Sequence, residues 1–272
     1  TPCTEDMITS PTDLQKLEEV GTHTVIVSYE GVTKIFTVIL VNSEGAIPYY
    51  ANSAGKTGTE LKLALRTIIS VTTHTCTYDE LKTILPRTDR GTDDPNKILL
   101  FYLRTEISAE WDPNTSTAWN REHIWPKSQG WFQTSGAGAD PHHIRASQVR
   151  ENSLRSNLPY GENGYGYEPI DEVKGDCARI IFYMLTRYSE SDSFSVTRVA
   201  QSMQMLLRWN ELDPVDSIET YRNNTIYDFQ GNRNPFIDDS DYAYMIWDTS
   251  KLEYNVSGEK FLYTGIQDIT II

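Results

Sequence analysis

The sequence predicts an α+β fold, with a few short strands near the middle of the chain and helices before and after them. Two segments after the middle, "VKGDCARIIFYMLTRY" and "SVTRVAQSMQMLLRWNEL", carry apolar residues at the spacing of amphipathic helices. Apolar runs such as residues 97–103 are short, as buried strands are. An apolar fraction of 39% and an aromatic fraction of 11% in 272 residues are sufficient for a sizeable core.

The first 44 residues differ from the rest and predict a β-rich segment. The run "THTVIVSYEGVTKIFTVILV" is rich in β-branched and aromatic residues, and Glu30-Gly31 at its centre predicts a hairpin turn. The run resembles the last strands of bacterial immunoglobulin-like repeats. It is too short for a complete sandwich, so it is either a partial repeat or a hairpin packed on the next domain. We expect one unit at residues 1–44 and the main domain at residues 45–272.

From residue 57 onward, two helices are expected first, then two strands, then further helices. Thr57 with Glu60, and Thr77 with Glu80, have the spacing of a capping box at the start of a helix. A second buried strand is predicted at residues 119–126, ended by the proline there. Further helices are expected at "SQVRENSLRSN" and "VDSIETYRNNTIYDF", besides the two amphipathic segments.

The net charge of −14, taken alone, argues against a nucleic-acid partner, because phosphates are bound by Lys and Arg. The sign reverses locally, since residues 119–157 hold five basic and three acidic side chains. An acidic body with a basic site is common in exported proteins. The sequence has no run of eighteen apolar residues that could span a membrane, and its first ten residues do not resemble a signal peptide. A mature secreted protein would look the same, so this leaves the compartment open.

The three cysteines Cys3, Cys76 and Cys177 are an odd number without C-x-x-C spacing, which argues against a zinc site. One disulfide is compatible with the sequence, and its pairing stays open. Cys177 lies in a run that predicts a buried helix, which favours a role as an apolar core residue.

The stretch "WNREHIWPKSQGW" concentrates reactive side chains, with Glu122 next to His123. It lacks the second histidine of an H-E-x-x-H zinc site, and the chain has no G-x-S-x-G elbow and no P-loop. Downstream, "DPHHIRASQVRENSLRSN" places Asn152 and Arg155 three residues apart, on one face of the predicted helix.

These side chains are the parts needed for metal-assisted hydrolysis of a phosphodiester. The carboxylate of Glu122 and the amide oxygen of Asn152 are hard ligands that suit Mg²⁺ or Ca²⁺. The imidazole of His123 can take a proton from water near neutral pH. Adjacent residues of a strand point to opposite faces, so the strand must end or bulge near Glu122 and His123 for both to serve one site.

Four motifs, "WNREHIWPKS", "DPHHIRASQVRENSLRSN", "KGDCARIIFYMLTRY" and "QGNRNPFID", follow the order and spacing of the endonuclease I family. The resemblance covers roughly residues 47–238 and implies a ββα-metal (His-Me finger) core surrounded by helices. It implies a secreted or cell-surface nuclease that cleaves DNA, and often RNA, with little sequence preference and leaves 5′-phosphates. Pro141 departs from the family pattern and bears on the loop between the two finger strands rather than on the chemistry.

The resemblance also implies roles for individual residues. His123 would be the general base, and Glu122 and Asn152 would hold Mg²⁺, with Ca²⁺ or Mn²⁺ as substitutes. We expect phosphate contacts from Arg155, Arg145 and Arg233, in falling order of preference, and we count Arg155 as a catalytic residue. Arg121 is a further substrate-binding candidate. Asp140 and His142 are expected to support the site without touching the ion or the substrate. We expect a monomer.

Several alternatives remain open at this stage. Arg155 could instead be a core residue that orients Asp140. The three tryptophans of the motif, Trp119, Trp125 and Trp131, could stack on bases, although at least two are expected in the core. A second hypothesis is a non-catalytic binding module at the cell surface, suggested by the immunoglobulin-like strands, the aromatic content and the negative charge.

Overall fold

The structure is a computed structural model that describes residues 48–92, 94–188 and 194–248, together with the backbone of four strands within residues 21–40 and 252–262. The chain divides into two compact units, residues 1–55 with 263–272, and residues 56–262. Across the described residues, no helix has the length and apolar character needed to cross a membrane.

The first unit contains a β-hairpin. Strands β1 (Gly21–Tyr29) and β2 (Val32–Leu40) pair antiparallel, with Gly21 opposite Leu40 and Tyr29 opposite Val32. This agrees with the hairpin predicted from the β-branched run, and the predicted turn residues lie outside the described part. A 3-10 helix, η2 (Pro48–Ser53), follows. The immunoglobulin-like origin of the segment and its boundary at residue 44 stay predictions.

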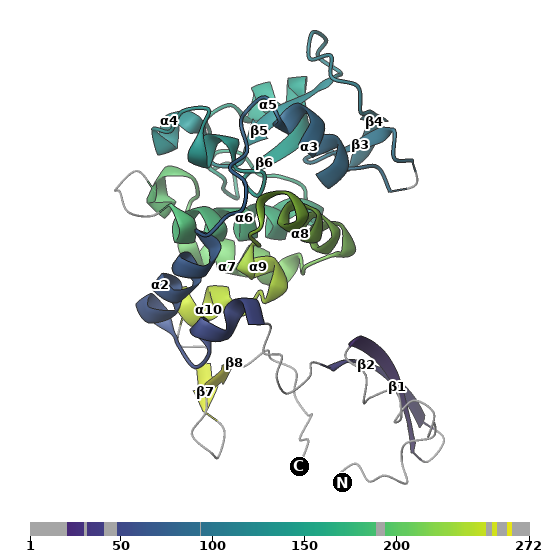
Figure 1. Cartoon of the computed structure of the whole chain (residues 1–272), viewed down its shortest axis with the longest axis vertical. Helices are drawn as coiled ribbons and strands as arrows, with labels where there is room; N and C mark the ends of the chain where they lie inside the picture. The colour runs from purple at the N-terminus through teal and green to yellow at the C-terminus, as the bar shows by residue number, and fades with distance from the viewer. Residues whose placement is uncertain are drawn as a thin grey trace. The chain divides into compact units, whose positions relative to one another are not determined.

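The second unit is built mainly from helices, with the strands of residues 97–148 at one end and helices α2 and α10 at the other (Figure 1). Its principal helices are α2 (Gly58–Ile69), α3 (Leu81–Thr88), α5 (Val149–Arg155), α6 (Lys174–Arg187), α7 (Met203–Leu212), α8 (Ser217–Gln230), α9 (Pro235–Asp238) and α10 (Tyr242–Trp247). The mixture of helices and small sheets confirms the predicted α+β class.

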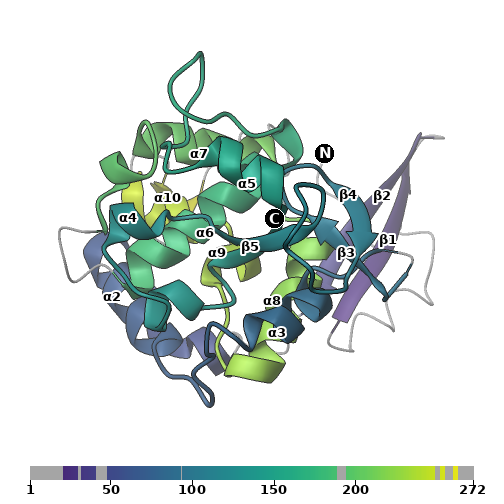
Figure 2. The same ribbon diagram turned by 90° about the horizontal axis from the view of Figure 1, so that it is seen from above.

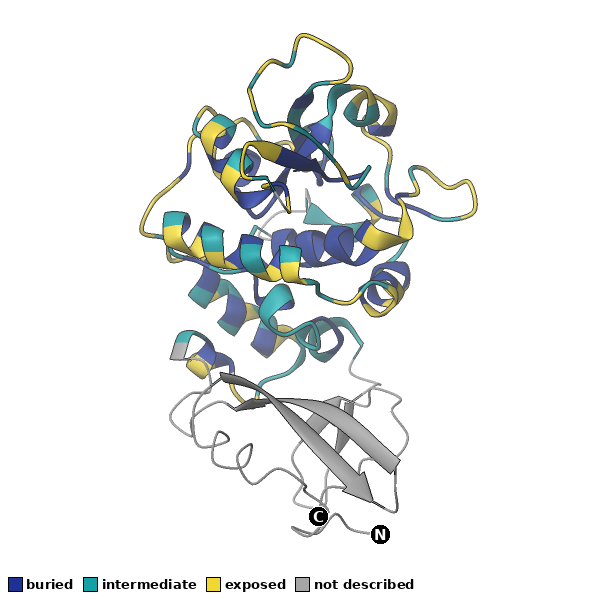
Figure 3. Cartoon of the chain, turned by 90° about the vertical axis from the view of Figure 1, so that its right-hand side faces the viewer, coloured by how far each residue is buried: buried dark blue, intermediate teal, exposed yellow. Residues whose placement is uncertain are grey.

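Helix α6 lies at the centre of this unit and is buried along almost its whole length (Figure 3). It packs against α2, α7 and α9. Because the helix is surrounded by protein, its sequence is apolar except where a charged residue finds a buried partner. This explains why the sequence predicts a buried helix at this segment. Cys177 lies in α6 and is buried and free, as is Cys76, so the prediction of an apolar core role for Cys177 is confirmed. Cys3 lies outside the described residues.

The strands of the second unit form antiparallel pairs. These are β3 (Lys97–Leu100) with β4 (Thr105–Ser108), β5 (Trp119–His123) with β6 (Ile144–Gln148), and β7 (Leu252–Tyr254) with β8 (Lys260–Leu262). The segment after β3 joins β6 through the bond from the Phe101 amide to the Ala146 carbonyl, 2.8 Å long. Side chains from α3, β3, β5 and β6 form a common apolar cluster, so the β5–β6 pair is attached to the core on one face.

The two predicted capping boxes behave differently. At Thr77 the box forms, since the Thr77 amide donates to Glu80 Oε2 at 2.7 Å and the Glu80 amide donates to Thr77 Oγ1 at 3.3 Å. At Thr57 the prediction is wrong: its hydroxyl makes no capping bond, and Glu60 instead pairs with Lys56 at 3.0 Å. A lysine one turn earlier competes for the glutamate that the box requires.

Candidate active site

A ββα unit is formed by strands β5 and β6 together with helix α5, which lies beside the strand pair (Figure 2). Strand β5 ends at His123, and the chain bends at Ile124 and Trp125. The strand therefore ends where the sequence required it to end. Register is kept up to that point, with Glu122 opposite Arg145 and His123 opposite Ile144, so there is no bulge in this pair.

Side-chain alternation along β5 sorts its residues onto two faces. Asn120 and Glu122 share the face beside α5, since Asn120 contacts Asn152 of that helix. Arg121 and His123 share the other face, where both rest against the ring of Tyr78. The carboxylate and the imidazole therefore leave the strand in opposite directions at its last two positions.

Glu122 is buried in a polar pocket beneath the strand. Its Oε1 accepts a hydrogen bond from the Tyr102 hydroxyl at 2.7 Å, and Arg155 Nε lies 3.6 Å from the same oxygen. The hydroxyls of Tyr102 and Tyr160 are in turn 2.6 Å apart. Burial raises the pKa of Glu122 above its usual value, while Arg155 and the Tyr102 bond oppose the shift. Arg155 and Tyr102 therefore hold the Glu122 carboxylate in place and partly compensate the cost of burying its charge.

Asn152 is held in one orientation on α5. Its Nδ2 donates to Asn120 Oδ1 at 2.8 Å and lies 3.4 Å from the carbonyl of Arg121. These bonds fix the amide group, and its Oδ1 has no partner among the residues that the structure describes. The free oxygen lies on the same side of β5 as Glu122.

A carboxylate and an amide oxygen on one side of β5 fit a hard divalent ion. No cluster of three or more His, Cys, Asp or Glu that could hold a metal occurs within the described residues. The pair formed by Glu122 and Asn152 is smaller than such a cluster and would leave most coordination positions to water and substrate, as Mg²⁺ prefers.

His123 has one ring nitrogen fixed and one open. Its Nε2 lies 3.1 Å from the carbonyl of Gly138, which can only accept, so Nε2 carries the proton. Nδ1 then bears the lone pair. It has no partner among the described residues and is not among their fully buried unpaired atoms, so it reaches solvent. The arrangement presents a neutral imidazole with its basic nitrogen outward.

Aromatic rings enclose the imidazole of His123. Ring centres of Tyr78, His143 and Phe132 lie 5.6, 5.5 and 5.9 Å from it. Burial is the main reason that the pKa of His123 falls to about 3, and the neighbouring His143 lowers it further. The histidine is therefore uncharged at neutral pH, as a general base must be before reaction.

His143 and His142 hold the loop that leads into β6. His143 Nδ1 donates to the carbonyl of Ala137 at 2.7 Å, and its Nε2 accepts from the Trp125 amide at 2.9 Å. His142 Nε2 lies 3.0 Å from the carbonyl of Asn232. Both rings are buried; backbone groups satisfy both nitrogens of His143, whereas Nδ1 of His142 has no hydrogen-bond partner among the described residues.

Asp140 is a buried anchor of the same loop. Its carboxylate accepts hydrogen bonds from Tyr183 and Tyr188 at 2.8 Å, from Arg187 at 2.6 Å and from Gln230 at 3.0 Å. These donors stand on or near α6 and α8, so Asp140 joins the loop to the helical body. Its support of the site is indirect, through the position of the loop that carries Gly138.

Two of the predicted phosphate contacts are corrected by burial. Arg145 pairs with Asp89 at 2.9 Å and lies 3.4 Å from Asp176, with 2% of its surface exposed. Arg155 is 1% exposed and donates to the carbonyls of Ile124 at 2.6 Å and Ser156 at 3.1 Å. Neither guanidinium can meet a substrate in this arrangement. Arg155 is a core residue, and it steadies Glu122 and the turn after β5 rather than Asp140.

Arg233 and Arg121 are less deeply placed. Arg233 makes two bonds to Asp238, at 2.6 and 2.7 Å, which favours a role in ordering its own loop. Arg121 lies 3.7 Å above the ring of Tyr78 and donates to the Tyr78 carbonyl at 2.5 Å. It forms no ion pair with any carboxylate among the described residues, although the protein is strongly acidic. Of the four arginines, Arg121 retains a charge that a phosphate could neutralise.

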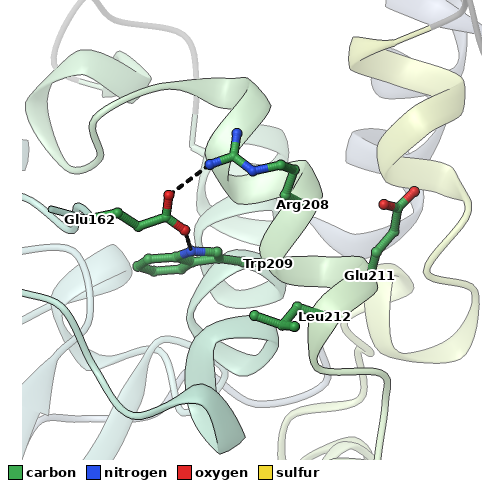
Figure 4. A pocket seen from close by; sticks show the side chains of 5 residues that line it. All are labelled: Glu162, Arg208, Trp209, Glu211 and Leu212. Carbon is green, nitrogen blue, oxygen red and sulfur yellow. Dashed lines mark hydrogen bonds and ion pairs between the residues drawn. The ribbon is translucent and has the colours of Figure 1, made fainter.

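A surface hollow elsewhere in the described part of the protein offers no competing chemistry. It is lined by Glu162, Arg208, Trp209, Glu211 and Leu212 (Figure 4). The carboxylate of Glu162 is occupied there, since Arg208 donates to it at 2.7 Å and the Trp209 indole at 2.6 Å. The candidate site instead lies at the end of β5, away from this hollow in the sequence and lined by other residues.

The ββα unit carries an imidazole, a carboxylate and an amide oxygen, a set of groups that suits hydrolysis of a phosphodiester. Comparison with known proteins agrees. The sequence model described as Endonuclease I matches residues 57–167 and 162–241. The chain belongs to the endonuclease I family and is an enzyme that hydrolyses phosphodiester bonds of nucleic acid, which excludes the alternative of a non-catalytic binding module.

Individual relatives are similar over most of the chain. An "Extracellular ribonuclease" of Bacillus amyloliquefaciens is 38% identical over 251 residues, which are 81% of this chain and 86% of that protein. A protein of the same name from Bacillus subtilis (strain 168) is 39% identical over 226 residues, 73% of this chain and 78% of that protein. An "Endonuclease-1" of Buchnera aphidicola subsp. Baizongia pistaciae (strain Bp) is 36% identical over 70 residues, 26% of each chain.

Sequence reasoning missed the groups that surround the reactive residues. Tyr102, which bonds to Glu122, is 20 positions away from it in the chain. Tyr160, which bonds to Tyr102, is 58 positions away from Tyr102. The Gly138 carbonyl that orients His123 is a backbone group and carries no side-chain signal. Only Tyr78 had a local indication, because it stands inside the capping box that fixes its position.

Proposed function

We propose that this protein is a metal-dependent, sequence-tolerant endonuclease that cleaves RNA and DNA and leaves 5′-phosphate ends. The observation that carries the proposal is the state of His123, whose Nε2 is fixed by the Gly138 carbonyl while Nδ1 is left open as a base. The names of the two Bacillus relatives support RNA as a substrate. Membership of the endonuclease I family supports DNA as a substrate less directly, because the description of the family names an endonuclease and not the nucleic acid that it cleaves.

In this proposal the β5–β6–α5 unit is a His-Me finger. His123 Nδ1 accepts a proton from a water molecule as that water attacks phosphorus, and the bond to the Gly138 carbonyl stabilises the imidazolium that forms. The low pKa of His123 belongs to the protein without substrate. An anionic phosphodiester near the ring would raise that pKa toward the range in which a base works well.

Glu122 and Asn152 are the proposed ligands of a Mg²⁺-type ion, with Ca²⁺ or Mn²⁺ as substitutes. When bound, the ion would supply stabilisation of the negative charge that develops on the phosphate and on the leaving oxygen. The chain's own contribution is to hold the two ligands ready: Tyr102 fixes the carboxylate and Asn120 fixes the amide. Second-sphere bonds of this kind commonly tune metal affinity.

Arg121 is the proposed phosphate contact. Stacking on Tyr78 fixes its guanidinium on the same face of β5 as His123, and no carboxylate among the described residues neutralises it. A planar, fixed guanidinium is well suited to hold a phosphate oxygen. Such a contact makes binding weaken as salt rises, even in a protein with a net charge of −14.

We further propose that the enzyme acts outside the cell as a monomer. The names of the Bacillus relatives support an extracellular location. All proposed catalytic groups come from one chain, on β5, α5 and the loop before β6, so no second copy is needed to complete the site.

The direct test is cleavage of plasmid DNA and of single-stranded RNA by the wild type and by His123→Ala, with Mg²⁺ and with EDTA. Loss of the base should slow cleavage by roughly 10²- to 10⁴-fold. Leu63→Ala, which truncates an exposed residue on α2, is the control. Full activity in EDTA, or an unaffected His123→Ala, would overturn the mechanism.

Metal binding has an independent readout. Mn²⁺ bound to the protein, followed by electron paramagnetic resonance or by calorimetry, should weaken in Glu122→Gln and Asn152→Ala without any nucleic acid present. Glu162→Gln changes a carboxylate that is engaged elsewhere and serves as the control. Equal Mn²⁺ affinity in all four proteins would refute the assignment of these ligands.

A further inference from the structure

The three tryptophans of the "WNREHIWPKSQGW" motif have different environments. Trp119 and Trp125 are completely buried, so at least two of the three are core residues, as predicted. Trp131 is 71% exposed. Its ring has no aromatic or cationic neighbour, and its indole nitrogen no hydrogen-bond partner, among the residues that the structure describes. Exposure alone is common for a single apolar residue, so the conformation and position of Trp131 decide whether it has a binding role.

The backbone holds Trp131 outward at an energetic cost. Trp131 follows α4 (Lys127–Gly130) in the left-handed region, with φ 56° and ψ 21°. Glycine or asparagine is the usual choice at such a position, because a side chain is strained there. A bulky aromatic in this conformation therefore has a function that its fold contribution does not explain.

The residues on either side fix Trp131 close to the catalytic histidine. The next residue, Phe132, packs its ring 5.9 Å from His123 and 5.4 Å from His143. The preceding residue, Gly130, allows this turn, because a Cβ there would lie 2.3 Å from the Phe132 ring. Trp131 is thus exposed directly beside a residue whose ring packs against His123.

The same short segment carries a positive charge. Lys127, the first residue of α4, is four residues before Trp131 and forms no ion pair among the described residues. Arg121 and His123 both rest on the ring of Tyr78, so a second cation lies beside the histidine. A nucleic-acid strand that reaches His123 could therefore meet basic side chains with its phosphates.

We propose that Trp131 stacks on an unpaired nucleobase next to the scissile phosphate while Lys127 contacts the adjoining backbone phosphate, so that the enzyme favours single-stranded nucleic acid. The inference rests on the proposed function, since it concerns the substrate of the same site. Bases of a duplex are already stacked on each other and offer no free face. Aromatic side chains bind single strands without sequence preference, because every base has a π-face.

The test compares kcat and KM for one labelled oligonucleotide as a single strand and as a blunt duplex. Trp131→Ala should raise KM for the single strand by roughly 5- to 100-fold, the range expected for loss of one stacked base, and leave kcat and duplex cleavage nearly unchanged. Trp131→Phe should recover most of the affinity. Leu63→Ala, which truncates an exposed apolar residue on α2, is the control and should behave as wild type.

A second substrate isolates the stacking itself. A single strand with an abasic nucleotide beside the cleaved bond should bind the wild type more weakly, and Trp131→Ala should lose nothing further on it. An unchanged KM for Trp131→Ala on the intact strand, in an enzyme that still depends on His123, would overturn this inference and leave the proposed function intact. Cleavage that is independent of His123 would instead refute the proposed function.

Discussion

Replacing His143 with glutamine is expected to remove part of the loss of stability that this protein should show in mild acid. Burial lowers the pKa of His143 to about 4, from an ordinary value of 6.5. The folded protein therefore holds this ring neutral, whereas the unfolded chain protonates it near pH 6.5. Its contribution to stability is complete above pH 6.5 and is lost as the pH falls toward 4.

The magnitude follows from the two pKa values. At pH 5 the unfolded ring is almost fully protonated and the folded ring is almost neutral, which amounts to about 2 kcal/mol of lost stability. Below pH 4 the loss approaches about 3.4 kcal/mol. The structure shows why the folded ring resists protonation: Nε2 accepts from the Trp125 amide at 2.9 Å, and a second ring proton would take that bond away.

The assay is urea denaturation of the wild type and of His143→Gln at pH 7.5 and at pH 5. Glutamine cannot be protonated and can replace one of the two backbone bonds, so the variant should be less stable at pH 7.5. The wild type should lose about 2 kcal/mol more than the variant between the two pH values. Leu63→Ala, at an exposed residue of α2 that carries no titratable group, should show the wild-type loss. Equal losses in His143→Gln and wild type would refute the reasoning.

Three further predictions concern the site and its support. Tyr102→Phe removes the 2.7 Å bond to Glu122 and should weaken Mn²⁺ binding roughly 10- to 100-fold, measured by calorimetry, and unchanged affinity would contradict the supporting role of Tyr102. Arg121→Ala should raise KM and reduce the slope of log affinity against log salt by about 0.7 to 0.9, and a slope equal to that of wild type would show that Arg121 meets no phosphate. Arg155→Met leaves the Glu122 carboxylate buried without its cation and should destabilise the fold by about 3 to 5 kcal/mol in urea denaturation, whereas a stable but inactive variant would return Arg155 to the catalytic residues.

The motif residues were predictable because their chemistry belongs to residue type. A carboxylate, an amide and an imidazole in "REH" and "ENSLR" are competent for metal-assisted hydrolysis wherever they meet. The end of β5 at His123 was also predictable, although the strand is regular up to that residue and alternation still directs Glu122 and His123 to opposite faces. These inferences need only the local sequence.

The arginines were not predictable in the same way. Arg145 looks like any basic residue of a positively charged segment, and its partners Asp89 and Asp176 stand 56 and 31 positions away. Arg155 reaches the carbonyl of Ile124 across 31 positions. Whether an arginine faces solvent or a buried acid depends on contacts between residues that are distant in the chain. Neither the periodicity of apolar residues nor a count of charges contains this information.

The tryptophans show the same division between local and tertiary information. Trp119, Trp125 and Trp131 have the same side chain in one short motif, yet two are buried and one is exposed. The turn after α4 decides the difference, because Gly130 admits the ring of Phe132 and thereby directs Trp131 outward.

The sequence by itself determined the α+β class, the hairpin near the N-terminus, the family and the set of residues able to carry the reaction, because these follow from residue type, spacing and periodicity. Only the tertiary structure decided which charges are free and which nitrogen of His123 is open. Burial and hydrogen bonding are set by groups brought together from distant parts of the chain: the Gly138 carbonyl against His123, Tyr102 against Glu122, and Asp89 against Arg145.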